Sequence, residues 1–195
     1  MKNAKKTLLF LLSLILLAAC IGCSGGSSEL FRLTDGDGNA VAFGMSKANV
    51  EKAFGETIGP NPNFGIFENG AQVGYRDGKA AFIACQAGDI SVAFAPEFYI
   101  ADPGTAIERG VTTRGEVYAL LGTPAGTDAQ TRTSVRYYYH KEGNKMVYLE
   151  KGLAALNGIE DQEKFKEYYE INFGFENDVV VYFQMADEYF IKLMK

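Results

Sequence analysis

The amino-acid sequence predicts an α+β protein of two tandem repeats, each a helix packed on an antiparallel β-meander. Two observations lead to this prediction. Residues 38–55 and residues 104–122 resemble each other at an offset of 66 to 67 residues, and strand-like runs of alternating or apolar residues follow both segments. A repeat of this period indicates one supersecondary unit that the chain uses twice.

The two segments match glycine to glycine and apolar residue to apolar residue. At an offset of 66 the matched pairs are Gly38/Gly104, Ala40/Ala106, Val41/Ile107, Gly44/Gly110 and Met45/Val111, and at an offset of 67 they are Val50/Val117, Phe54/Leu121 and Gly55/Gly122. Turn glycines and core positions therefore recur together.

Each repeat is expected to open with an extended stretch around a turn, at 35–39 in the first and 102–104 in the second. A helix follows in both. Ser46 can cap the first helix and Gly55 can end it. Val50 falls on its apolar face, which predicts that this side chain is buried in the core.

The second helix begins with Thr113-Arg114-Gly115-Glu116, a capping-box pattern, and ends at Gly122. Strands are expected at 80–85 and 90–95, joined through Gly88-Asp89, and at 135–140, 146–150, 169–175 and 179–185, the last two closed into a hairpin at 176–178. Unit 1 is then predicted over residues 30–97, and unit 2 over residues 98–195 with an insert at 151–167.

The N-terminus predicts export. Three lysines precede residues 8–19, which are apolar except for Ser13 and too few to span a bilayer, as in a signal peptide. The run ends Leu17-Ala18-Ala19-Cys20, which resembles the bacterial lipobox. This resemblance implies removal of residues 1–19, lipid attachment to Cys20, a flexible tether over residues 20–29, and a lipid-anchored location on the extracytoplasmic side of a bacterial cell envelope. The alternative is an ordinary secretory signal.

The cysteines do not form a convincing metal or redox motif. Cys20 and Cys23 have C-x-x-C spacing, but the pair spans the expected cleavage site and no second pair exists. Cys85 lies in an apolar strand-like run and is expected to be a small buried residue. A Cys23–Cys85 disulfide is the alternative.

Composition argues against nucleic acid as a partner. Removal of residues 1–19 leaves 16 Lys and Arg against 24 Asp and Glu, a net charge of −8. An acidic chain without a basic run is a poor nucleic-acid binder. The remaining chain is long enough to bury a core, which 14 Phe and 11 Tyr supply with large apolar area.

The helix segments GMSKANVEKAFG and GVTTRGEVYALLGTP carry a resemblance to a known family. They are similar to the helix motif of the beta-lactamase-inhibitory-protein-like tandem repeat family, and small outer-membrane assembly lipoproteins use the same unit once. Unit 1 departs from the motif, with Glu56-Thr57 where unit 2 has Thr123-Pro124. The resemblance implies the fold of an exported binding module, and does not imply that this chain inhibits an enzyme.

Catalytic and metal motifs are weak. The single histidine, His140, has no nucleophile-elbow motif to accompany it, so no catalytic residue, cofactor or metal site is predicted. Asp35-Gly36-Asp37-Gly38-Asn39 begins like a calcium loop, but Ser46 stands where the closing Glu belongs. A plain hairpin turn is therefore favoured over a calcium site.

Alternation in the unit 2 strands predicts a binding face. The apolar set is Val135, Tyr137, Tyr139, Val147, Leu149, Ile171, Phe173, Phe175, Val179, Val181 and Phe183, which should face the core. The opposite face should present the candidate partner-binding residues Arg136, Tyr138, His140, Tyr148, Asn172, Tyr182 and Gln184, together with Glu150. Tyrosine on an open sheet is typical of protein recognition. The alternatives are a merely solvated face or one covered by the insert.

The function that these observations favour is a lipid-anchored, extracytoplasmic, non-enzymatic module that binds a protein or peptide through an aromatic sheet face. Two alternatives stay open. One is an envelope structural or assembly lipoprotein without a tight partner, and the other is a small hydrolase that uses His140.

Overall fold

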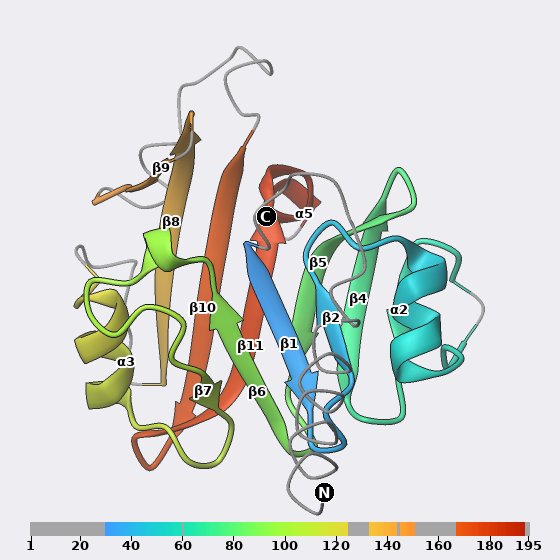
Figure 1. The fold of residues 1–195 in the computed structure, drawn as a ribbon, viewed down its shortest axis with the longest axis horizontal. Coiled ribbons are helices and arrows are strands. Elements are labelled where there is room, and N and C mark those ends of the chain that lie inside the picture. The colour runs from blue at the N-terminus through green and yellow to red at the C-terminus, as the bar shows by residue number, and fades with distance from the viewer. Residues whose placement is uncertain (1–29, 60, 125–132, 144, 151–166, 194–195) are drawn as a thin grey trace, which may run out of the picture.

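The computed structural model describes residues 30–59, 61–124, 133–143, 145–150 and 167–193, which form a mixed α+β fold (Figure 1). In chain order the elements are β1 (Phe31–Asp35), β2 (Ala40–Ala42), α2 (Lys47–Phe54), β3 (Phe64–Ile66), β4 (Ala71–Arg76), β5 (Lys79–Cys85), β6 (Ile90–Phe94), the 3₁₀ helix η1 (Pro96–Phe98), β7 (Ile107–Glu108), α3 (Arg114–Leu121), β8 (Ser134–Glu142), β9 (Lys145–Tyr148), β10 (Tyr168–Glu176), β11 (Val179–Asp187) and α5 (Glu188–Leu193).

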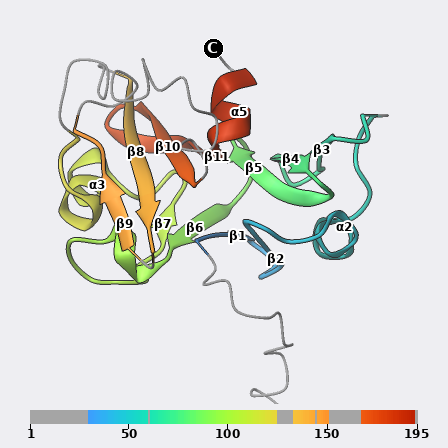
Figure 2. The ribbon, with the colours of Figure 1, turned by 90° about the horizontal axis from the view of Figure 1, so that it is seen from above.

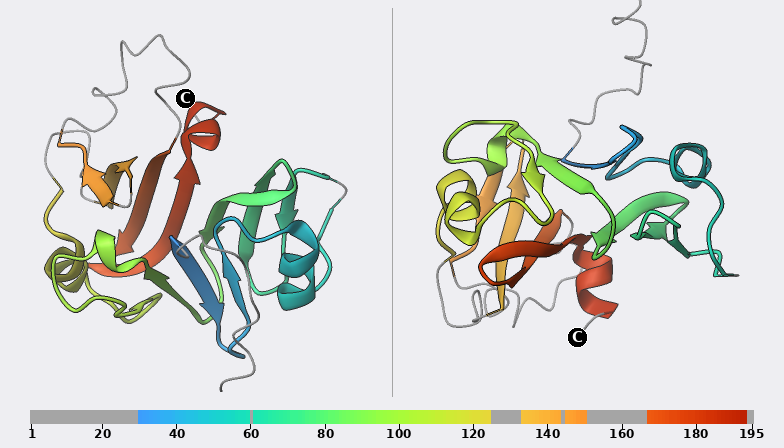
Figure 3. Two further views of the ribbon diagram at one scale, coloured as in Figure 1. Left: turned by 45° about the horizontal axis from the view of Figure 1, so that its top comes forward. Right: turned by 90° about the horizontal axis from the view of Figure 1, so that it is seen from below.

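The strands form two antiparallel sheets. The first has the order β2-β1-β6-β7, and the second has the order β3-β4-β5-β11-β10-β8-β9. The sheets form two layers, with α2 and α3 near opposite ends and α5 on the outer side of the seven-stranded sheet (Figures 2 and 3). Strand β5 pairs with β11, so strands about 100 residues apart in the chain lie side by side in one sheet.

The main hydrophobic core lies between these layers. It includes Leu33 and Val92 from the four-stranded sheet, and Ile83 and Phe173 from the seven-stranded one. Val50 and Val117, from the apolar faces of α2 and α3, are both fully buried in the same cluster. The prediction that both helices bury their apolar faces in the core is confirmed at Val50 and Val117.

Local signals place both helices correctly. The Ser46 hydroxyl accepts a hydrogen bond from the Asn49 N–H at 3.4 Å, and α2 ends at Gly55. Thr113 and Glu116 form the predicted capping box, with the Thr113 N–H donating to Glu116 Oε2 at 2.7 Å. Both caps satisfy N–H groups that a helix start otherwise leaves unpaired.

Each helix start is hydrogen-bonded to the beginning of a hairpin strand. The Gly44 N–H donates to the Ala80 carbonyl, and the Gly110 N–H donates to the Val180 carbonyl, both at 2.7 Å. The turn at 176–178 is the predicted hairpin, since Asn177 and Asp178 have φ of 51° and 65°, as in a type I′ turn.

The strands at 80–85 and 90–95 exist, but they do not form the expected pair. Strand β5 belongs to the seven-stranded sheet and β6 to the four-stranded sheet, so residues 86–89 cross between the layers. Gly88 has a φ of 75°, and a Cβ there would lie 2.6 Å from the Asn69 carbonyl oxygen, so this crossing requires glycine. The sequence reading also missed β3 and β4.

Three of the predicted core assignments in unit 2, Val147, Val179 and Val181, are wrong. The pairing register between β10 and β11 changes at one point. Gly174 pairs with Tyr182, but the next residue, Phe175, pairs with Val180, so Val181 has no partner in β10. The irregularity places Val180 in the core, whereas Val179 and Val181 are half-buried. In β9, Val147 is 36% exposed, because it pairs with His140 rather than with a core residue.

Several predictions fall outside the described residues: the signal peptide, the Cys20 anchor, the tether, Cys23 and most of the insert at 151–167. Cys85 is buried, as expected, and its thiol donates to the Ala87 carbonyl. Across the described ranges, no helix has the length and apolarity needed to cross a membrane.

Helix α5 is capped by a buried carboxylate. Asp187 Oδ1 accepts hydrogen bonds from the N–H groups of Tyr189 and Phe190 at 3.1 and 3.2 Å, and Oδ2 lies 2.8 Å from Arg76 Nη1. Burial raises the pKa of Asp187 to about 6, although the Phe190 N–H and the Arg76 guanidinium oppose this shift. Because this folded pKa is above the ordinary 3.8, the contribution of Asp187 to stability falls as the pH rises from about 4 to about 6.

We expect Arg76→Met to destabilise the protein more at pH 8 than at pH 5. At pH 8 the buried Asp187 carboxylate is ionised and loses its cation, whereas at pH 5 it is largely protonated in both chains. Urea unfolding at the two pH values measures the difference. Lys52→Met, on the exposed surface of α2, is the control for loss of one charge. An equal loss at both pH values would contradict the proposed pairing.

Candidate functional site

The predicted binding face lies on the outer side of the seven-stranded sheet. In β8, Tyr137 and Tyr139 point to the core and Tyr138 points to the other side, as the alternation predicts. Across the sheet, Arg136 pairs with Asn172, which pairs with Gln184. Six of the seven predicted residues therefore lie on this face, five of them gathered on adjoining strands and His140 farther along β8.

We call the resulting group the polar cluster: Arg136, Tyr138, Glu170, Asn172, Tyr182 and Gln184. Its interior is not the open surface that the sequence predicts. Tyr138 is 1% exposed, and Glu170 and Gln184 are each 6% exposed. The expectation of an exposed tyrosine face is therefore corrected, because the side of the sheet away from the core is also covered at these residues.

Hydrogen bonds connect part of the polar cluster. The Tyr182 hydroxyl donates to Gln184 Oε1, and Gln184 Nε2 donates to Glu170 Oε1 at 3.2 Å. Burial raises the pKa of the Glu170 carboxyl, and the nearby Arg136 guanidinium opposes that shift. Burial also raises the pKa of Tyr182 to about 12, with the Glu170 charge adding to the effect.

Two predicted binding residues lie outside the polar cluster, Tyr148 on the other side of the sheet and His140 farther along the same face. Tyr148 pairs with Tyr139 across β8 and β9 and so shares the core side of the sheet, where its ring centroid is 6.2 Å from that of Tyr137. His140 is half-buried and stacks on the Tyr168 ring at 4.4 Å, with Nδ1 3.6 Å from Glu142 Oε1. These two contacts are with a tyrosine ring and a carboxylate, and neither brings a Ser, Thr or Cys nucleophile to His140.

Tyr148 instead lines an aromatic pocket at the edge of the molecule. The pocket is formed by η1 and the residues after it, the end of α3, strand β8 and the edge strand β9. Its lining includes Phe98, Tyr99, Ile100, Tyr137, Tyr139, Met146 and Tyr148. The Phe98 and Tyr139 rings meet edge to face at 4.8 Å.

The hydroxyl groups of two pocket tyrosines donate hydrogen bonds to backbone carbonyls. The Tyr137 hydroxyl donates to the Gly122 carbonyl at 2.7 Å, and the Tyr99 hydroxyl donates to the Thr105 carbonyl at 2.7 Å. These rings therefore present apolar surface to the pocket. Ile100, which is 70% exposed, stands at its rim. An apolar cavity with an exposed hydrophobic rim is typical of a binding site.

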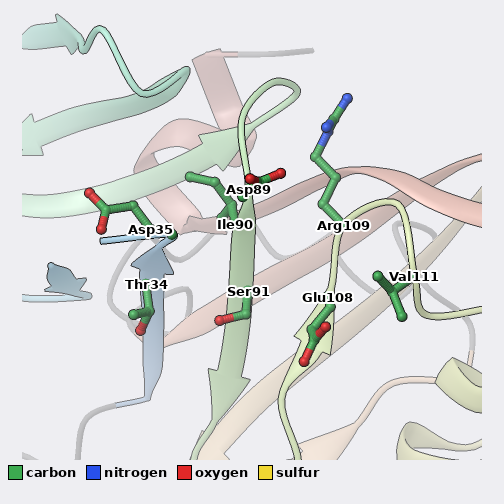
Figure 4. A pocket seen from close by; sticks show the side chains of 9 residues that line it. Thr34, Asp35, Asp89, Ile90, Ser91, Glu108, Arg109 and Val111 are labelled. Atoms are coloured by element: carbon green, nitrogen blue, oxygen red, sulfur yellow. The ribbon is translucent and has the colours of Figure 1, made fainter. Parts of the chain in front are cut away.

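A second hollow lies where β1 and β7 end and β6 begins (Figure 4). Asp35, Asp89 and Glu108 are among its lining residues, and Arg109 extends away from Thr34 and Ser91 in the figure. Arg109 donates to the carbonyls of Val181 and Gly88 at 3.0 and 3.1 Å, so it ties β11 to the 86–89 crossing. Its role here is structural.

Asp35 in this hollow stabilises a turn. Burial acts to raise its pKa, but hydrogen bonds from Asn39, Asn69 and Asp37 outweigh it and lower the pKa below the ordinary value. Strands β1 and β2 pair around this turn, so the predicted hairpin is confirmed. Among the described residues, no group of three or more His, Cys, Asp or Glu side chains could hold a metal ion.

Sequence reasoning missed two features. Glu170 has the same strand parity as Asn172 and could have been assigned to the predicted face from that pattern. The segment Pro96–Ile100 was treated as the junction of the units, although its consecutive apolar and aromatic residues were a usable signal for a pocket wall.

Comparison with protein-family models, with curated proteins and with solved structures gives no significant match. The site is therefore interpreted from its own geometry and chemistry.

Proposed function

We propose that this chain is a lipid-anchored, extracytoplasmic, non-enzymatic module that binds a protein or peptide partner. We further propose that it consists of two copies of one helix-and-antiparallel-sheet unit, as in the beta-lactamase-inhibitory-protein-like family that its helix motifs resemble. The observation that carries the binding proposal is the aromatic pocket beside edge strand β9.

Strand pairing supports the two-unit arrangement. Around the pair Leu33–Val92, Phe31 pairs with Phe94 and Asp35 with Ile90. Strands β5 and β11 show the same relation. On either side of the pair Ala84–Gln184, Ile83 lies opposite Met185 and Cys85 lies opposite Phe183. Such pairing is expected when two equivalent units meet around an approximate two-fold axis.

Contacts at the helix starts support the same arrangement. The Lys47 ammonium lies 5.6 Å from the Tyr75 ring centroid, and the Arg114 guanidinium lies 4.2 Å from that of Phe175. Lys47 and Arg114 are the first residues of α2 and α3. The register irregularity of the β4–β5 hairpin at Gly74/Tyr75 also recurs in the β10–β11 hairpin at Gly174/Phe175.

These equivalences favour a boundary within residues 86–89, where the chain crosses between sheets, over the boundary at 97/98 expected from the sequence. In this division β6 and β7 correspond to β1 and β2. Strand β9 and helix α5 then have no counterpart in the first unit.

The position of β9 supports a binding role for the pocket. Met146 and Tyr148 of β9 line one wall of the pocket, and β9 ends the strand order of the sheet. The first unit has no such strand, so the fold of a unit does not require it. An edge strand offers backbone groups to an extended peptide, and an adjoining pocket can take one of its side chains.

We expect Ile100→Asp to weaken partner binding at least tenfold, about 1.4 kcal/mol, without lowering the melting temperature. Ile100 is largely exposed, so the fold tolerates the charge, whereas an apolar side chain entering the pocket would meet it. A pull-down of a tagged chain from solubilised envelope identifies the partner, and titration against it measures the change. Ile58→Asp, at another exposed isoleucine, is the matched control.

Equal affinity of both variants would reject the pocket as the binding site. Recovery of no stoichiometric partner would favour the alternative of an envelope structural or assembly lipoprotein. Turnover of an ester or amide that is lost in His140→Ala would favour the hydrolase alternative.

The anchor is tested separately. We expect Cys20→Ser to abolish lipid attachment, because the thiol of the lipobox cysteine is the acylated group. Incorporation of a radioactive fatty acid into the two chains measures it, with Cys23→Ser as the control. Equal labelling of Cys20→Ser and the unaltered chain would leave the ordinary secretory signal as the explanation.

A further inference from the structure

The aromatic pocket has room for a ring. Its cavity volume is about 270 Å³, and a cavity of about 150 Å³ with apolar walls can bind benzene. Its walls include Phe98, Tyr139 and Tyr148, and the ring centroids of Tyr139 and Tyr148 lie 5.7 Å apart in an edge-to-face contact. Aromatic rings favour such contacts with one another, so a further ring is the apolar group that these walls suit best.

The pocket lining also contains a carboxylate without a countercharge. Glu97, in η1, is exposed and forms no ion pair or hydrogen bond among the described residues. No Lys, Arg or His is among the described residues of the lining. Lys141 follows Tyr139 on the same side of β8, but its ammonium lies 3.7 Å from Glu167 Oε1 and is already paired. The net charge of the chain, −5, also favours a basic partner.

Part of the β9 backbone points toward the edge of the sheet beside this pocket. The Leu149 N–H donates to the Tyr138 carbonyl at 2.8 Å. Because hydrogen-bonded pairs alternate in an antiparallel ladder, Val147 also faces β8, whereas the N–H and C=O of Met146 point away from it. The Met146 side chain lines the pocket and β9 ends the strand order, so a segment paired with Met146 would run along the pocket.

An added strand can direct only alternate side chains toward the pocket. Successive side chains of a strand point to opposite faces of the sheet. When an aromatic side chain enters the pocket, its immediate neighbours therefore face the other side, and the residues two positions away share its side. Glu97 lines the pocket, so a basic residue can reach it from that spacing and not from the adjacent position.

We propose that the partner inserts an aromatic side chain into the aromatic pocket from an extended segment paired with β9, and that a basic residue two positions away pairs with Glu97. This inference rests on the proposed function and names the chemistry of the segment that the pocket takes. The ring supplies most of the affinity, since its apolar surface leaves water. An exposed ion pair contributes less, so the basic residue mainly selects a basic partner over an acidic one.

The test uses the full chain and blocked pentapeptides, titrated by calorimetry at low ionic strength. Acetyl-Arg-Thr-Phe-Thr-Arg-amide has the proposed spacing on both sides of the ring, so it serves either direction of the added strand. Acetyl-Thr-Arg-Phe-Arg-Thr-amide has the same composition and charge, with the arginines adjacent to the ring. We expect the first to bind several-fold more tightly than the second, and alanine in place of its phenylalanine to weaken it at least about tenfold.

Variants of the chain test the charge preference. Glu97→Gln is expected to weaken the first peptide about two- to fivefold at low salt and less at high salt. Glu56→Gln, at an exposed carboxylate outside the pocket, is the control and should bind like the unaltered chain. Ile100→Asp and Ile100→Lys remove the same apolar side chain from the rim, and the lysine variant should bind the first peptide several-fold more weakly than the aspartate variant.

Failure of both arginine peptides to bind would overturn the proposal. Equal affinity of the two peptides, or equal weakening by Glu97→Gln and Glu56→Gln, would also overturn it, because binding would then follow overall charge alone. Tighter binding to Ile100→Lys than to Ile100→Asp would exclude a basic segment. The proposed function survives each of these failures if Ile100→Asp still weakens binding of the partner recovered from the envelope, since the pocket would then take a segment of other chemistry.

Discussion

Val50→Asp and Val117→Asp are each expected to lower the free energy of unfolding by more than about 4 kcal/mol. Both valines are fully buried, on the apolar faces of α2 and α3, and neither has a cation beside it in the core cluster. The ionised aspartate must lie unpaired in the core, bind a proton, or displace the helix. Urea unfolding of the two variants measures the loss.

Ala48→Asp and Gly115→Asp are the matched controls, since they stand at equivalent exposed positions near the starts of the same helices. Aspartate there is exposed and lies close to the positive end of the helix dipole. We expect changes below about 1 kcal/mol. A Val50 or Val117 variant that unfolds like its control would mean that the helix is not packed in the core.

Tyr138→Ala is expected to cost about 3–5 kcal/mol, because it leaves a cavity where a large buried ring was. For a chain of this size that corresponds to a decrease in melting temperature of about 2–4 °C per kcal/mol. The sequence alone predicted the opposite, an exposed ring whose removal has little effect. Thermal melts distinguish the two predictions directly.

Tyr138→Phe is the informative control for the hydroxyl. Its loss removes a buried polar atom that has no partner, so the stability should be unchanged or slightly higher. A large loss of stability in Tyr138→Phe would mean that the hydroxyl is hydrogen-bonded in the folded protein.

The features that sequence reasoning placed correctly depend on residues close together in the chain. Ser46 and Thr113 cap the helices that follow them, and the turn at 176–178 closes the expected hairpin. Alternation in β8 separates Tyr137 from Tyr138. A cap, a two-residue turn and strand parity are set within a few residues, and so the sequence carries them directly.

The errors arise where a residue's environment depends on distant segments. Tyr148 lies on the core side because β9 pairs with β8 in one particular register, and a shift of one residue would reverse it. Val180 replaces its neighbours in the core because of an irregularity between β10 and β11. Neither the register nor the irregularity has a signal in the local pattern.

By itself, the sequence determined the α+β class, both helices with their caps, the final hairpin and the buried residues Val50, Val117 and Cys85. Only the tertiary structure decided that β5 joins β11 in one sheet, that Tyr138 and Glu170 are buried, and that the aromatic rings form a pocket at the sheet edge. The physical reason is that capping and alternation come from hydrogen bonds and side-chain geometry along the chain, whereas burial is a property of which remote surfaces meet.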